Sequence, residues 1–249
     1  MAYIGASTPA FGTDSVTATW PAAYTPTAGD FAIIVTANGP NSGATAPDFG
    51  TPTDWDLRAR NNDIIGWDSA AGDQSVFTRH LAGGDTLPTF TNPSGAYYVV
   101  AYTLVFSDIH ATTPMDATPV LDSTTSATWQ PTGITTVTAN AYVLTLFCNP
   151  RFSHSPTGTG YAANGFTNVV TTTGTTARGA SAAGYLVKAS AGAQTMPTYV
   201  SDSDTICHIA MALRPVGVTA ELNQEGFRWR ADDGSETTAT WLAAQDTAP

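Results

Sequence analysis

Apolar and polar residues alternate in short runs along most of this chain, and Gly- and Pro-rich turns separate the runs. A period of two is typical of a β-strand with one buried face, and residues 16–20 and 75–80 have it. Residues 31–37 and 96–107 are almost wholly apolar, which indicates strands that are buried on both faces. No convincing amphipathic helix precedes residue 220. Further strands are predicted over residues 135–138, 141–148, 169–173, 180–188 and 205–213.

The order of these strands repeats at a fixed offset of 109 residues. Residues 87–90 (LPTF) match residues 196–199 (MPTY), and residues 32–36 match residues 141–145. Because separate blocks share one offset without a net insertion, we interpret the chain as two copies of one set of strands. Identity between the copies is low, and the alternative is chance similarity between β-rich segments. The proposed copies are residues 31–105 and 141–214.

About ten strands punctuated by turns predict an all-β fold, a jelly-roll-like sandwich of two sheets built from the two duplicated halves. A closed barrel that holds a ligand is less favoured. Each half has too few strands to bury its apolar face alone. We therefore expect one body over residues 1–216 rather than two independent domains.

The composition changes after residue 216, where a tail of residues 217–249 begins. Residues 227–230 alternate as a strand, residues 232–235 (DDGS) form a turn, and residues 237–241 return as a second strand. An isolated hairpin is marginally stable in water, so this hairpin must dock on something. The expected partner-docking residues are Phe227, Arg228, Trp229, Arg230 and Trp241.

Charge and hydropathy narrow the classes of function. The 249 residues carry a formal net charge of −11, with Lys188 as the single lysine, so a basic surface for nucleic acid is lacking. The N-terminus has no basic region, and no apolar stretch approaches the roughly 18 residues that a membrane helix needs. We therefore expect neither a signal peptide nor a membrane span, and a protein that is made in a cytoplasm.

The sequence offers little catalytic chemistry. No glutamate precedes Glu221, and the aspartates lie mostly in turns, so the carboxylate pair of a glycosidase is not indicated. The four histidines lack the spacing of a metal site, and His208 fits a hydrogen-bonded core residue. Asp202-Ser203-Asp204 and Asp54-Trp55-Asp56 offer oxygen ligands for calcium, but solvated turns explain them as well. We therefore expect no catalytic residue, no metal and no cofactor, and a protein that is not an enzyme.

Three side chains leave alternatives open. Cys148 and Cys207 belong to apolar strands, so we expect two buried free thiols, with a disulfide as the alternative if the strands are neighbours. Trp55 lies in a polar loop between two aspartates, which makes it the candidate ligand-binding residue for a sugar. Packing in a core or an interface is the more common role of tryptophan.

Residues 225–241 (EGFRWRADDGSETTATW) resemble a recurrent segment of phage structural proteins and prokaryotic surface proteins, where it joins or ends β modules. The body, with residues 28–30 (AGD), 51–55 (TPTDW) and 113–117 (TPMDA), is similar to the β-sandwich domains of phage virion proteins. The resemblance implies a non-enzymatic virion component, a capsid decoration protein or a head or tail fibre. The alternative is a lectin-like module that binds a carbohydrate or a receptor.

The same resemblance implies the partners. They are other virion proteins, either capsid or tail subunits, and further copies of this chain, for which we expect a trimer. A host surface glycan is a further expected partner, because fibres are often adhesins. Neither nucleic acid nor a membrane is expected, and the expected location is the virion.

Overall fold

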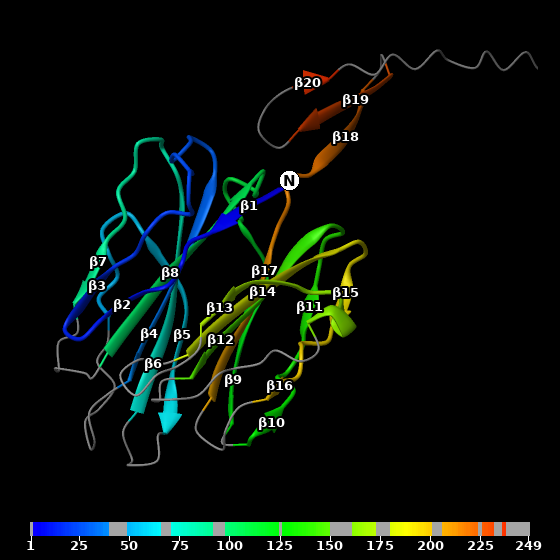
Figure 1. The fold of residues 1–249 in the computed structure, drawn as a ribbon. Coiled ribbons are helices and arrows are strands. Elements are labelled where there is room, and N and C mark those ends of the chain that lie inside the picture. Colours follow the sequence, from blue (N-terminus) through cyan, green and yellow to red (C-terminus); the bar gives the residue numbers. More distant parts are fainter. Residues whose placement is uncertain are drawn as a thin grey trace, which may run out of the picture.

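The computed structural model describes most of the chain as β-strands joined by turns (Figure 1). The described residues are 2–39, 49–65, 71–91, 98–124, 126–149, 161–172, 180–200, 206–223, 226–231 and 236–237. Among them there is no α-helix, and a single short 3-10 helix, η1, spans Ala162–Asn164.

Two large antiparallel sheets form the body, one from each half of the chain. The first sheet has the order β1-β8-β4-β6-β5, with β2 also paired to β8. Its strands are β1 (Ala2–Ala6), β2 (Ala10–Gly12), β4 (Phe31–Gly39), β5 (Asp56–Ile65), β6 (Ala71–His80) and β8 (Tyr98–Ser107). The second sheet has the order β13-β14-β12-β17-β9. Its strands are β9 (Met115–Thr124), β12 (Ala141–Asn149), β13 (Thr167–Thr171), β14 (Ala180–Lys188) and β17 (Ile206–Leu213).

The two sheets are copies of each other, which confirms the duplication. Reading the second sheet from β9 to β13 reproduces the order of the first from β1 to β5. The register agrees as well, because Ala32 pairs with Arg79 in the first sheet and Ala141 pairs with Lys188 in the second. Both members of the pair are shifted by 109 residues, the offset seen in the sequence. The pairing of β12 with β17 likewise repeats that of β4 with β8 at this offset.

The large sheets pack face to face around one apolar core, which confirms the predicted sandwich. Edge strand β5 lies against β9, and edge strand β1 lies against β13. Because β1 corresponds to β9 and β5 corresponds to β13, these two contacts are equivalent. The halves are thus related by a pseudo-twofold axis, as two subunits of a symmetric dimer would be. The core is formed by residues of both sheets, among them Ile33, Tyr102, Leu104, Phe106, Tyr142, Leu144, Ile209 and Met211.

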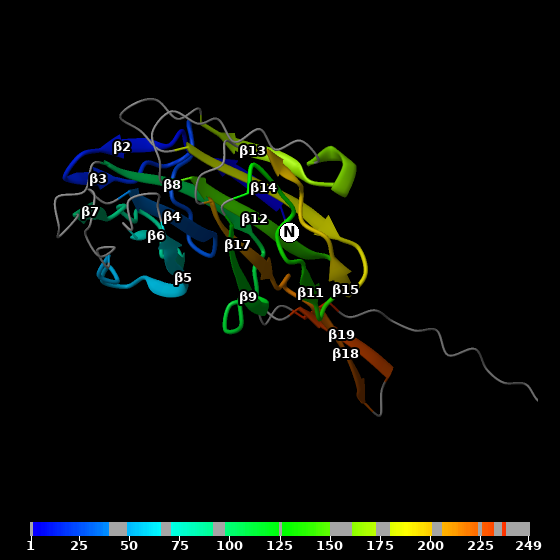
Figure 2. The ribbon, with the colours of Figure 1, turned by 90° about the horizontal axis from the view of Figure 1, so that it is seen from below.

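Each large sheet is also covered on its outer face, so the body has four layers rather than two (Figure 2). The central strands are apolar on both faces, and the outer faces therefore need a cover. A small sheet of β3 (Ser15–Thr17) and β7 (Thr89–Thr91) covers the first half. Two small sheets cover the second half, β10 (Thr128–Trp129) with β16 (Tyr199–Val200) and β11 (Ile134–Thr136) with β15 (Gly192–Gln194).

The tail forms a separate small sheet of three antiparallel strands. The predicted hairpin is present as β19 (Gly226–Ala231) and β20 (Glu236–Thr237), and β18 (Val218–Asn223) adds a third strand that the sequence reading missed. These strands pair with one another and with no strand of the body, from which they project (Figures 1 and 2).

Candidate docking site

The body has two different ends. Strands β4 and β12 end, and the antiparallel strand β17 begins, at the same end of the body, so Gly39, Asn149 and Ile206 lie there. At the opposite end lie β1 and the start of the tail, which follows β17 beyond Leu213 (Figure 1). The tail therefore leaves the end of the molecule farthest from Gly39 and its counterparts.

Backbone hydrogen bonds hold the root of the tail on the body. The Arg214 N–H donates to the Pro114 carbonyl at 2.8 Å, and the His110 N–H donates to the Arg214 carbonyl at 3.0 Å. The Val216 N–H donates to the Asp108 carbonyl at 2.9 Å. A single residue separates this pinned segment from β18, so the tail sheet is held on a short connection.

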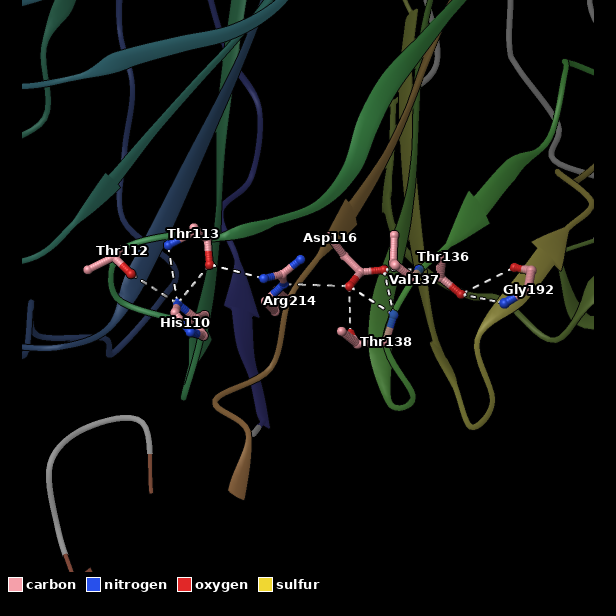
Figure 3. A network of polar contacts seen from close by, with 9 residues as sticks. All are labelled: His110, Thr112, Thr113, Asp116, Thr136, Val137, Thr138, Gly192 and Arg214. Carbon is pink, nitrogen blue, oxygen red and sulfur yellow. Dashed lines mark hydrogen bonds and ion pairs between the residues drawn. The ribbon is translucent and has the colours of Figure 1, made fainter. Parts of the chain in front are cut away.

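Side chains around Arg214 link the root of the tail to the second sheet (Figure 3). The Arg214 guanidinium donates to Thr113 Oγ1 at 3.3 Å, and its Nε lies 3.8 Å from Asp116 Oδ1. The imidazole Nδ1 of His110 accepts the Thr113 N–H at 3.1 Å. Arg214 and Thr113 lie 101 residues apart in the sequence, so no local pattern predicts this network.

Asp116 is the most connected carboxylate of this network. It is buried, and it accepts the backbone N–H groups of Val137, at 2.6 Å, and of Thr138, at 3.1 Å. The Thr138 hydroxyl donates to the same carboxylate. Asp116 therefore fixes the turn that follows β11 beside the root of the tail.

Replacing Asp116 by alanine should lower the free energy of unfolding by about 3 kcal/mol, because two part-buried backbone N–H groups would lose their acceptor. Asp116→Asn should recover part of this loss, since its amide oxygen can still accept one of the two hydrogen bonds. Urea denaturation of the two variants and the wild type measures the difference. Equal stability of Asp116→Ala and the wild type would contradict this role.

A shallow open groove of about 640 Å³ runs between edge strands β5 and β9 beside this network. Its lining includes the apolar residues Leu57, Met115, Ala117 and Val137 and the charged residues Arg58 and Asp116. Val137 is 66% exposed and Leu57 is 37% exposed, so the groove presents apolar surface to solvent. We call it the β5–β9 groove.

The register of the tail sheet separates its apolar positions from its charged ones. Leu222 is opposite Phe227, and Ala220 is opposite Trp229. Residues directly opposite each other share a face, so positions 218, 220, 222, 227, 229 and 231 lie on one face. Positions 221, 228, 230 and 236, two glutamates and two arginines, lie on the other. The backbone thus has the amphipathic pattern of a docking sheet.

The expected docking residues are only partly placed. Phe227, Arg228, Trp229 and Arg230 lie in β19, with Phe227 and Trp229 on one face and the arginines on the other. Trp241 lies outside the described residues. Their docking role stays a prediction.

Trp55 is in the core rather than on the surface, which corrects its assignment as a ligand-binding residue. Its side chain is 5% exposed and packs with Phe49, Phe77 and Phe90 on the outer face of the first sheet. The Trp55 N–H donates to the Pro52 carbonyl at 3.1 Å, and this turn folds the ring inward. A ring that is covered in this way does not stack on a sugar.

The aspartates considered as calcium ligands are placed only in part. Asp54 lies 4.0 Å from Arg79, and Asp56 forms a 2.7 Å ion pair with Arg58. Among the described residues, no three His, Cys, Asp or Glu side chains are grouped so as to hold a metal ion. The calcium candidate at residues 202–204 lies outside those residues.

Cys148 and Cys207 are buried free thiols directly opposite each other on β12 and β17. The Cys207 thiol donates to the Cys148 carbonyl at 3.2 Å. Burial raises the pKa of Cys207 well above its usual range, so this thiol stays protonated and unreactive.

His208 is buried in the second sheet, as expected of a hydrogen-bonded core residue. Its Nε2 lies 2.8 Å from the hydroxyl of Thr145, which also contacts the hydroxyl of Tyr199 at 2.5 Å. Burial lowers the pKa of His208 to about 3, so the ring is neutral near pH 7.

Asp73 is an acidic group buried in the first sheet. The Ser75 hydroxyl donates to its carboxylate at 3.0 Å, and Arg60 Nε lies 3.6 Å away. Burial raises the pKa of Asp73 to about 6, because these partners offset the desolvation of the carboxylate only in part.

Comparisons with protein-family models, curated proteins and solved structures give no match to this chain. No helix in the described part of the chain is long and apolar enough to cross a membrane.

Proposed function

We propose that this chain is a non-enzymatic structural component of a phage virion, a capsid decoration protein or a head or tail fibre. The observation that carries the proposal is the difference between the two ends of the body. A small amphipathic sheet leaves one end on a pinned root, and strand ends of both halves gather at the other. This arrangement suits a protein that is fixed to a particle at one end and projects from it.

Three further features support a structural role. The sandwich has a continuous inter-sheet core and two covered outer faces, which suits a rigid spacer. The tail residues 225–241 carry the resemblance to phage structural proteins. The net charge of −11 favours solubility and disfavours binding to anionic polymers. The partners in this proposal are other virion proteins and further copies of the chain.

A glycan-binding adhesin is the second candidate function. The pseudo-twofold axis brings Gly39 and its counterpart Cys148 to the same end of the body, so both halves face one direction there. Such a paired surface suits multivalent binding of a host glycan. Trp55 takes no part in it. A glycan array that gives no binding to the full chain would count against this candidate.

Deleting residues 218–249 should leave the body folded and abolish incorporation into particles. The deletion retains the hydrogen bonds of Arg214 and Val216 that close the end of the body. Immunoblots of particles assembled with the truncated chain, together with thermal denaturation of the purified chain, measure the two effects.

A matched control is Val187→Asp, which adds a charge at an exposed apolar position of β14, outside the tail. This variant should be incorporated normally. Normal incorporation of the truncated chain would contradict the role of the tail.

A further inference from the structure

The pseudo-twofold axis relates the β5–β9 side of the sandwich to the β1–β13 side. Aromatic rings fill the β1–β13 side, whereas the groove on the β5–β9 side is open. On that related side, between β1 and β13, the ring of Tyr3 lies 5.5 Å from the ring of Phe106 and 4.5 Å from that of Tyr185. On the β5–β9 side, Leu57 and Val137 remain exposed around the groove. Among the described residues, the apolar side chains at the β5–β9 groove are thus left open, in contrast to the related side.

The tail sheet has the complementary apolar pattern, and among the described strands it pairs with none of the body. Its register puts Leu222, Phe227 and Trp229 on one face, and no strand of the body pairs with it. On the opposite face the register places Glu221 opposite Arg228, and Arg230 opposite Glu236. An apolar face that a small sheet leaves in water is a surface of the kind that marks a docking site.

We propose that the tail sheet of one copy packs its apolar face into the β5–β9 groove of a second copy of this chain. The proposal rests on the docking role given to the tail above and names its receptor. Each copy carries one sheet and one groove, so two different surfaces meet in every contact. Repetition of such a contact builds a ring, a closed exchanged dimer or an open chain of subunits.

The short root of the tail favours packing of the tail sheet on the groove of a second copy over packing on its own groove. Arg214 and Val216 are both pinned by backbone hydrogen bonds, and β18 begins two residues after Val216. With this connection intact, the sheet projects away from its own body (Figures 1 and 2). Packing on its own groove would require the sheet to turn back at the single residue between Val216 and β18, whereas a second copy meets the sheet as it stands.

Sedimentation velocity over a range of concentrations tests the proposal on the full chain and three variants. Val137→Asp places a charge in the groove, and Trp229→Asp places one on the apolar face of the tail sheet. Each should weaken self-association about tenfold or more, while Val187→Asp, an exposed valine on another part of the body, should not change it. Circular dichroism and thermal denaturation establish that every variant is folded.

Mixing the two defective variants gives the sharpest result. Val137→Asp retains an intact tail and Trp229→Asp retains an intact groove, so an equimolar mixture should form a one-to-one heterodimer. A monomeric wild type would overturn the proposal. Loss of association in Trp229→Asp alone, with no heterodimer in the mixture, would also overturn it, because the tail would then bind elsewhere.

This test separates the two proposals. Self-association through the groove is measured in solution without particles, whereas the proposed virion role depends on the presence of the chain in particles. A chain that is present in particles but fails the mixing experiment would refute only the groove as receptor. A chain that passes the mixing experiment but is absent from particles would refute only the virion role.

Discussion

Replacing Trp55 by alanine is expected to lower the free energy of unfolding by about 3–5 kcal/mol. The indole packs among buried aromatic rings on the outer face of the first sheet, and removal of it would leave a cavity beside Phe77 and Phe90. Urea denaturation followed by far-ultraviolet circular dichroism measures the loss. Any fall in ligand binding by this variant should therefore follow the fraction of unfolded protein.

Val137→Ala is the matched control, because Val137 is 66% exposed and its truncation should change the stability by less than about 0.5 kcal/mol. A loss of less than about 1 kcal/mol in Trp55→Ala would mean that the ring is not in the core. That result would return Trp55 to the candidate ligand-binding residues.

His208 is expected to make the protein less stable as the pH falls from about 6.5 toward 3. Its pKa is about 3 in the folded protein and 6.5 when exposed, so between these values only the unfolded chain binds the proton. The free energy of unfolding then falls by about 1.4 kcal/mol per pH unit. Asp73 acts in the opposite direction, because its pKa is raised to about 6 and the folded protein gains a proton first.

Two variants separate these contributions. Relative to the wild type, His208→Leu should gain stability as the pH falls below 6.5, since it has no ring to protonate. Asp73→Asn should be more stable than the wild type at pH 8, and this advantage should disappear between about pH 6 and pH 4. Urea denaturation at half-unit pH steps measures both effects. Parallel curves for His208→Leu and the wild type would contradict the burial of a neutral His208.

The repeat was the most informative feature of the sequence. A register is fixed by which face of a strand is buried, so two copies with the same apolar pattern must pair in the same way. Ala32 and Ala141 therefore have equivalent partners, although few residues are identical. The small covering sheets were harder to predict, because strands of two or three residues such as β3 and β10 are too short to show a period.

Edge strands account for the main omissions. The sequence of β5, DLRARNNDII, is rich in charged and amide side chains, which obscures the apolar pattern of a strand, and β5 lies at the edge of its sheet. Strand β9 contains Pro119, which argues against a central strand but is tolerated at an edge. These two strands form the groove, so the candidate receptor of the tail could not be predicted from the sequence without them.

The prediction that Trp55 binds a ligand was wrong for a related reason. Two flanking aspartates made its segment look like a polar loop, but the turn from Pro52 points the ring toward the sheet. Local polarity describes the residues that adjoin Trp55 in the chain. The burial of Trp55 depends on packing against residues that come later in the sequence, such as Phe77 and Phe90. The network of Asp116 and Arg214 was invisible for the same reason, since it joins segments that are far apart.

The copy number of this chain in purified particles tests most directly whether it is a part of a phage particle, as we propose. Quantitative mass spectrometry against the major capsid protein gives this number. We predict a fixed stoichiometry, with hundreds of copies for a capsid decoration protein and a few to a few tens for a fibre or tail component. Absence of the chain from purified particles would contradict the proposed virion role and leave the glycan-binding adhesin as the better explanation.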